Sequence, residues 1–229
     1  MLIILPGWMH DAAQWDAVSK RLDNLKIKHV VLDFPGFGSV ASDELIVEFK
    51  DLVTWSKTEI QHLTVDNDEP VTLLGHSCGG RIALALAVDN TDYHQLILVG
   101  SPNLYRPGLK VRIIKVITKL AAPVKFLFPT TLRRKLRSDD YDQAKESNMN
   151  ELYRSVVIND QTALTSRVST KVNLLWGEHD PAAPVHIAYE LDKLLVDSTL
   201  TILPNLGHNL HQENPGLLAA TINAYLTHD

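Results

Sequence analysis

The pentapeptide Gly75-His76-Ser77-Cys78-Gly79 has the pattern Gly-x-Ser-x-Gly and is the most chemically informative stretch of the sequence. It follows an apolar run at residues 71–75 that predicts a strand, and it precedes a helical pattern at residues 79–88. In this context the small residues permit a strained turn that projects the Ser77 hydroxyl above a sheet. A serine held in this way can act as a nucleophile if a base accepts its proton.

A base and a group to orient it follow later in the chain. Asp180 lies in the loop after an apolar run at residues 172–176, and His208 follows another run at residues 200–203. The order serine, aspartate, histidine is typical of hydrolases with this kind of turn, and open α/β sheets form their sites at the carboxyl ends of strands. We therefore predict that Ser77 is the nucleophile, His208 the base and Asp180 the group that holds the imidazole.

Each of these assignments has an alternative. Asp180 stands before a proline, so a turn or a helix N-cap is a simpler role for it when it is considered alone. His179 and His211 could replace His208 as the base. The glycine before His208 allows a sharp turn there, whereas His211 lies where a helix begins, and His208 is therefore favoured.

Stabilising the negative oxygen of an acyl-transfer intermediate requires two backbone N–H groups. The first is expected from Cys78, the residue after the nucleophile. The second is expected from the loop after the first strand, most simply from Trp8, because Gly7 lets the backbone approach closely. Gly7 and His76 are also candidates for contact with a substrate.

The elements that must position these residues alternate along a chain of 229 residues, 45% hydrophobic and 21% charged. Short apolar runs predict six strands, and residues with three- and four-residue apolar spacing predict helices between them, which together favour an α/β fold with a mainly parallel sheet. The predicted strands are 2–5, 29–33, 71–75, 96–100, 172–176 and 200–203, and the helices include 12–22, 43–62, 79–88, 185–195 and 216–226.

The composition limits the class of protein. Cys78 is the single cysteine, so an intramolecular disulfide and a cysteine-built zinc site are excluded, and we expect no metal ligands. The first apolar run is too short for a signal peptide, and no run is long enough to cross a bilayer. A cytoplasmic location is therefore expected.

Residues 102–167 contain helical patterns and no convincing strand, and we interpret them as a helical cap inserted into a core of residues 1–101 and 168–229. Residues 106–137 hold ten lysines and arginines and no acidic residue, which leaves a net formal charge of −15 on the rest of the chain. The amphipathic pattern in this segment could attract a membrane surface or an anionic ligand, although solubility of an apolar cap is the favoured explanation. Nucleic acid is not an expected partner, because no nucleic-acid-binding module is present.

Several motifs together resemble the α/β-hydrolase fold superfamily, over the whole chain apart from the insertion. They are Leu5-Pro6-Gly7-Trp8 with Trp15 downstream, Asp33-Phe34-Pro35-Gly36-Phe37-Gly38, Gly75-His76-Ser77-Cys78-Gly79-Gly80, Trp176-Gly177-Glu178-His179-Asp180 and Gly207-His208-Asn209-Leu210-His211-Gln212-Glu213-Asn214-Pro215. The resemblance implies a triad of Ser77, His208 and Asp180, a helical lid between the sixth and seventh strands of the family pattern, and no cofactor. The chain departs from the family in carrying Pro6 where a histidine is usual. It also lacks the first two of the usual eight strands, which leaves a sheet of about six.

Within this superfamily Ser77 argues against the haloalkane dehalogenases and epoxide hydrolases, which use an aspartate at the turn. The favoured function is a carboxylesterase that acts on a small or medium ester with an apolar acyl part through an acyl-serine intermediate. A lyase or C–C bond hydrolase is an alternative, because Gly79-Gly80-Arg81-Ile82-Ala83 is similar to the menaquinone-pathway synthase. There, a basic residue near the turn can meet a substrate carboxylate, although a helix-surface position is the favoured interpretation of Arg81. A ligand receptor that retains the turn as a relic is the second alternative.

Overall fold

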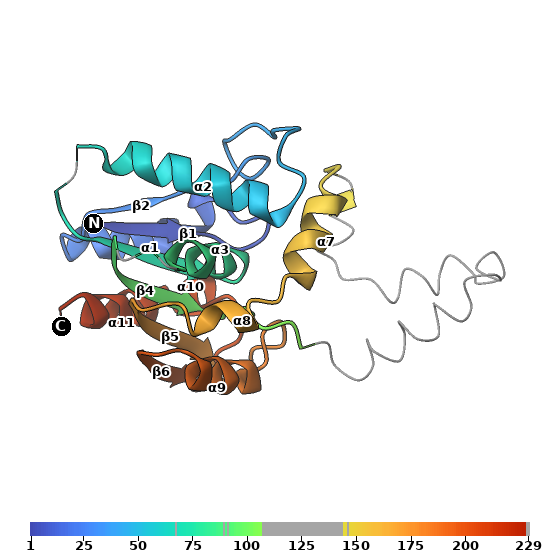
Figure 1. The fold of residues 1–229 in the computed structure, drawn as a ribbon. Helices are drawn as coiled ribbons and strands as arrows, with labels where there is room; N and C mark the ends of the chain where they lie inside the picture. Colours follow the sequence, from blue (N-terminus) through green and yellow to red (C-terminus); the bar gives the residue numbers. More distant parts are fainter. Residues whose placement is uncertain (67, 89, 91, 107–143, 146, 228–229) are drawn as a thin grey trace.

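The computed structural model describes residues 1–229 except 67, 89, 91, 107–143, 146 and 228–229. A sheet lies at its centre (Figure 1), and it has six strands. The strands lie in the order β2-β1-β3-β4-β5-β6, and each neighbouring pair is parallel. Their bounds are β1 Leu2–Leu5, β2 His29–Val31, β3 Val71–His76, β4 Tyr93–Val99, β5 Lys171–Gly177 and β6 Ser198–Leu203. The expected α/β fold with a six-stranded parallel sheet is confirmed.

Helices cover both faces of the sheet (Figure 1). Because successive strand residues point to opposite faces, Leu2 and Ile4 belong to one apolar core while Ile3 and Leu5 belong to the other. The first core is closed by α1 (Ala12–Asn24), α10 (Leu210–Glu213) and α11 (Pro215–Thr227). The second is closed by α2 (Phe49–Thr64), α3 (Cys78–Ala87) and α9 (Val185–Leu194).

The helix predicted over residues 43–62 begins later, at Phe49. The Asp51 carboxylate accepts hydrogen bonds from the backbone N–H groups of Glu48, at 2.9 Å, and Val47, at 3.3 Å. Asp51 and Glu48 form a capping box, which fixes the first turn of α2 at this point and leaves residues 43–48 outside the helix. The prediction was wrong at this boundary because the capping residues, rather than the apolar spacing, set where the helix starts.

Between β4 and β5, the described residues include the helices α7 (Asn150–Ile158) and α8 (Thr162–Thr165), and they form no strand. Helix α7 packs against α2, and α8 packs against α9. The predicted amphipathic basic helix lies outside the described residues, apart from Arg106, and the boundaries of the cap stay a prediction. None of the described helices has the length and apolar character that a membrane crossing needs.

Candidate active site

Ser77 lies at the turn between β3 and α3 with φ 52° and ψ −112°, a conformation that is unfavourable for a residue with a side chain. The turn is possible because the glycines around it let backbones approach closely. A β-carbon at Gly79 would collide with the carbonyl oxygen of Leu5, and one at Gly75 would collide with the backbone of Gly80. The Ser77 N–H donates to the Val99 carbonyl at 3.0 Å, which anchors the turn to the end of β4.

Asp180 and His208 form a hydrogen-bonded pair after β5 and β6. The Asp180 Oδ2 accepts from His208 Nδ1 at 2.7 Å, and the Asp180 side chain is fully buried. Its other oxygen, Oδ1, accepts from the backbone N–H groups of Ala182 at 2.8 Å and Ala183 at 2.7 Å. Both carboxylate oxygens are therefore held, and with Nδ1 of His208 bonded, Nε2 is the nitrogen left to accept a proton.

The end of β4 lies between this pair and Ser77. A β-carbon at Gly100, where φ is 50°, would lie 3.0 Å from Asp180 Oδ2 and 3.2 Å from His208 Nδ1. The next residue, Ser101, donates its hydroxyl to the Ser77 carbonyl at 3.0 Å. The structure thus places Ser77 after β3, Asp180 after β5 and His208 after β6, all at the carboxyl edge of the sheet.

The two alternative bases lie in different surroundings. The side chain of His179 is 65% exposed, and its Nε2 lies 3.9 Å from Glu178. His211 is fully buried, and its ring stacks on Trp15 with centroids 4.7 Å apart. Of the three candidate histidines, His208 is the one for which a hydrogen bond to Asp180 is observed.

The loop after β1 lies against the start of α3. A β-carbon at Gly79 would lie 2.5 Å from the Pro6 carbonyl oxygen, and Cys78 is the first residue of α3, so its N–H has no partner within the helix. The Trp8 ring contacts Phe37 and Tyr153 edge-on, at 5.1 Å between centroids in both cases. The backbone segments expected to supply the two oxyanion N–H groups are therefore adjacent, and that role stays a prediction.

Arg81 and Cys78 are both buried in α3. Arg81 is 5% exposed, and its guanidinium donates to the Asn159 carbonyl at 2.5 Å. The helix-surface interpretation of Arg81 was wrong because nine of the ten residues of α3 are buried, which leaves it no solvent face. Burial raises the pKa of the Cys78 thiol to about 12, and an inert thiol fits a structural residue rather than a redox one.

Sequence patterns did not reveal a group of three histidines behind the pair. His76 is fully buried, and its Nε2 donates to the His208 carbonyl oxygen at 3.0 Å. His10 and His211 lie beside it, with ring centroids 5.6 Å and 4.9 Å from that of His76. Burial and the neighbouring histidines lower the pKa of all three, that of His211 to about 3, so the rings are neutral at pH 7. The three come from distant segments, and no local spacing could have identified them.

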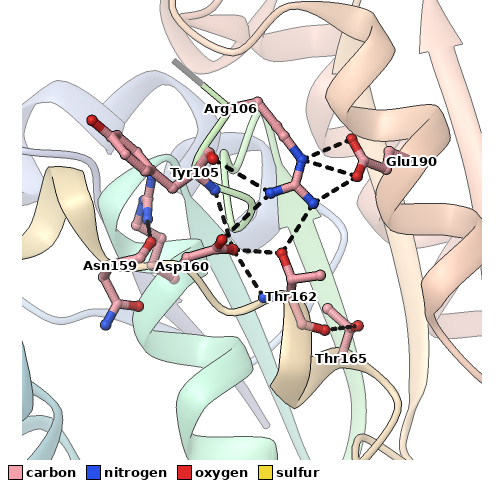
Figure 2. Close-up of polar contacts among 8 residues, drawn as sticks. Tyr105, Arg106, Asn159, Asp160, Thr162, Thr165 and Glu190 are labelled. Carbon is pink, nitrogen blue, oxygen red and sulfur yellow. Dashed lines mark hydrogen bonds and ion pairs between the residues drawn. The ribbon is translucent and has the colours of Figure 1, made fainter. Parts of the chain in front are cut away.

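Arg106, the first cation of the basic segment, is paired with the core (Figure 2). Its guanidinium forms a two-pronged contact with Glu190 of α9, at distances of 2.6 to 3.1 Å. It also donates to Asp160 at 3.4 Å and to the Thr162 hydroxyl at 3.1 Å. This network ties the entry to residues 107–143 to α9 and α8, so Arg106 is not a free cation that could meet a membrane or an anionic ligand.

Comparisons with known proteins identify the family of the chain. The model of the alpha/beta hydrolase family matches residues 2–221. A pimeloyl-[acyl-carrier protein] methyl ester esterase from Aliivibrio fischeri is 24% identical, and the match covers 90% of this chain and 86% of the relative. A protein of the same name from Vibrio vulnificus is 26% identical over the same shares.

Solved structures show the same fold. An esterase from Thermogutta terrifontis superposes with a TM-score of 0.72 at 19% identity, covering 98% of this chain and 88% of that one. A lipase-like protein from Acinetobacter baumannii superposes with a TM-score of 0.73 at 20% identity, covering 98% and 82%. The six-stranded parallel sheet, its covering helices and the family match over residues 2–221 lead to one conclusion: the chain belongs to the alpha/beta hydrolase family.

Proposed function

We propose that the protein is a serine hydrolase, specifically a carboxylesterase that acts on a small or medium ester with an apolar acyl part. The observation that carries the proposal is the buried Asp180–His208 hydrogen bond at the same sheet edge as the strained Ser77. A carboxylate that orients an imidazole beside a serine is the arrangement that makes the hydroxyl nucleophilic.

In the proposed reaction, the Ser77 Oγ attacks the carbonyl carbon of the ester while His208 Nε2 takes the hydroxyl proton. Asp180 holds the imidazole through Nδ1 and stabilises its positive charge. His208 then returns the proton to the departing alcohol, which leaves an acyl-serine. A water molecule, deprotonated by His208, releases the acid and restores Ser77.

The amides of Trp8 and Cys78 are proposed to bind the oxyanion, because the loop after β1 and the start of α3 are adjacent. Gly7 is proposed to contact substrate. His76 and Arg81 were candidates for the same role, but both are buried and bonded to backbone carbonyls. We therefore give them no direct contact with substrate, and the alternative that Arg81 meets a substrate carboxylate loses its support.

The relatives named as methyl ester esterases support an ester as the substrate class. Attraction of the basic segment to a membrane surface or an anionic ligand remains a proposal for the nine cations other than Arg106. A cytoplasmic location is likewise proposed, as expected from the sequence, and the free thiol of Cys78 is compatible with a reducing compartment.

A fluorophosphonate probe tests the proposed nucleophile, because it forms a stable covalent bond with an activated serine. The wild type should gain the mass of one phosphonyl group, which is the probe less the HF that leaves, and peptide mapping should locate it on Ser77. The Ser77→Ala variant should not be labelled. The matched control is Ser101→Ala, which removes the neighbouring buried serine and should leave labelling in place. Labelling of Ser77→Ala to the wild-type extent would contradict the proposal.

A further inference from the structure

Three histidines from distant segments converge behind the proposed active site. His10 lies in the loop after β1, His76 is the last residue of β3, and His211 lies in α10. One ring nitrogen from each can be chosen so that all three atoms lie within 4.8 Å of one another. Nitrogen donors gathered at this spacing are close enough for one ion to bind all three after small side-chain movements.

Four of the six ring nitrogens of this group are buried and lack hydrogen-bond partners. His10 Nδ1, His76 Nδ1 and both nitrogens of His211 are in this condition. Buried polar atoms are nearly always paired, because leaving one without a partner costs free energy, so four of them in one cluster call for an explanation. An ion that accepts the lone pairs would satisfy one nitrogen of each ring.

The surroundings fix which nitrogen His76 can offer. Its Nε2 donates to the His208 carbonyl oxygen, so Nδ1 carries the lone pair. A histidine that binds a metal through one nitrogen usually donates its other N–H to such a carbonyl or carboxylate. A β-carbon at Gly7 would lie 2.8 Å from His76 Nδ1 and 3.4 Å from His10 Nδ1, so the glycine keeps the space beside both nitrogens free.

The loop after β1 is folded to place His10 there. The His10 N–H donates to the Gly7 carbonyl at 3.1 Å, and Met9 has a positive φ of 55°. A left-handed conformation is unfavourable for methionine, and this tight turn brings the His10 ring over His76. His10 is also partly exposed, which gives an ion a route from the surface.

We propose that His10, His76 and His211 bind a divalent transition-metal ion, with Zn²⁺ as the expected occupant. Neutral imidazoles are ligands for first-row divalent ions, and zinc accepts three histidines with water in a fourth, tetrahedral position. Tetrahedral Zn²⁺ with Zn–N bonds of about 2.0 to 2.1 Å places nitrogens roughly 3.3 Å apart, so the rings must approach by up to about 1.5 Å.

The ion would link three segments that carry the proposed catalytic groups. His10 is two residues from Trp8, His76 precedes Ser77, and His211 is three residues from His208. Each ligand thus lies within three residues of a group that must be held in place. The site is structural in this proposal, since the ion itself takes no part in the ester reaction.

Metal binding is tested on the untagged full chain after treatment with a chelator, with Zn²⁺ and Co²⁺ as probes. The wild type should bind one equivalent of Zn²⁺ in competition with a chromophoric chelator, and one equivalent of Co²⁺ with the intense visible absorption of a tetrahedral complex. His211→Phe keeps an aromatic ring to stack on Trp15 and removes the ligand, and His10→Phe does the same beside His76. Both variants should lose at least tenfold in affinity. His62→Ala, which removes an exposed histidine of α2, should bind as the wild type does.

Thermal unfolding gives an independent readout that does not depend on activity. Zn²⁺ at 100 times its dissociation constant should raise the Tm of the wild type by about 5 °C or more, and the Tm of the two phenylalanine variants by much less. Near-UV circular dichroism checks that these variants are folded. The proposal is overturned if the wild type binds no Zn²⁺ at micromolar concentration, or if folded His211→Phe and His10→Phe bind it as tightly as the wild type.

Discussion

The Asp180–His208 pair and the histidine cluster of His10, His76 and His211 are neighbours with opposite hydrogen-bonding states. Both oxygens of Asp180 accept hydrogen bonds, two from the backbone and one from His208. In the cluster, four buried ring nitrogens have no partner. The hydrogen bond from His76 to the His208 carbonyl joins the two groups. Complete bonding orients a group for proton transfer, whereas unpaired lone pairs remain available to a ligand from outside the chain.

Replacing Asp180 with asparagine breaks the pair without removing the nucleophile, and it should cause a larger loss of kcat than the other substitutions of this kind. The carbonyl oxygen of the new side chain can still accept from Ala182 and Ala183, but its NH₂ group would donate to His208 Nδ1 and leave the proton on Nε2. The imidazole then presents the wrong tautomer to Ser77. We expect kcat of Asp180→Asn for a short-chain p-nitrophenyl ester to fall about 10⁴-fold, measured with steady-state kinetics.

Glu178→Gln is the matched control, because Glu178 lies in the same loop and is partly exposed, with its Oε2 accepting from the Asn205 N–H. We expect kcat to change less than about threefold, since the amide oxygen of glutamine can accept the same bond. Equal losses in the two variants would mean that the loop, and not the carboxylate of Asp180, is what activity requires.

The histidine cluster should affect the pH dependence of the free energy of unfolding rather than kcat. Burial keeps the folded-state pKa of His211 at about 3, below the value of about 6.5 for an unfolded histidine. The unfolded chain therefore binds more protons between these values, and the free energy of unfolding falls as the pH drops through this window. For His211 the loss between pH 7.5 and pH 5 is about 2 kcal/mol.

His211→Phe removes this contribution, so its free energy of unfolding should fall by about 2 kcal/mol less than that of the wild type between the two pH values. Urea unfolding in the presence of a chelator measures it, with His62→Ala as the control variant. Identical pH dependence in His211→Phe and the wild type would show that His211 is not held neutral.

The ion pair of Arg106 with Glu190 should have the smallest effect, because both side chains are partly exposed to water (Figure 2). We expect Arg106→Ala to lower the Tm by roughly 1 to 3 °C, with Glu190→Gln giving a similar loss and the double variant less than the sum. Lys20→Ala, which breaks the more exposed pair with Asp16, should lower the Tm by less than about 1 °C. Additive losses from Arg106→Ala and Glu190→Gln would show that the two side chains do not interact.

The sequence was a good guide wherever a local pattern decides the structure. The apolar runs predicted all six strands, since a strand covered on both faces needs an uninterrupted apolar segment. The residues Ser77, Asp180 and His208 could be named because each follows such a run, and the structure places Asp180 and His208 in direct contact. Their roles in the reaction remain predictions.

Features that depend on distant segments were not predictable. Arg81 was interpreted as a helix-surface residue, yet nearly every residue of α3 is buried. The histidine cluster joins positions 10, 76 and 211, and only the packing of the loop after β1, the end of β3 and α10 brings them together. Contacts between segments that are far apart in the chain produce no local pattern in a single sequence.

We propose that the Ser77 hydroxyl, activated by His208 and Asp180, is the nucleophile of an esterase. The most direct test of this proposal is kcat/KM of the wild type, Ser77→Ala and Ser101→Ala across p-nitrophenyl esters of increasing acyl length. We expect measurable turnover by the wild type, a loss of about 10⁴-fold or more in Ser77→Ala, and activity within about tenfold of the wild type in Ser101→Ala. Turnover by folded Ser77→Ala within about tenfold of the wild type would contradict it.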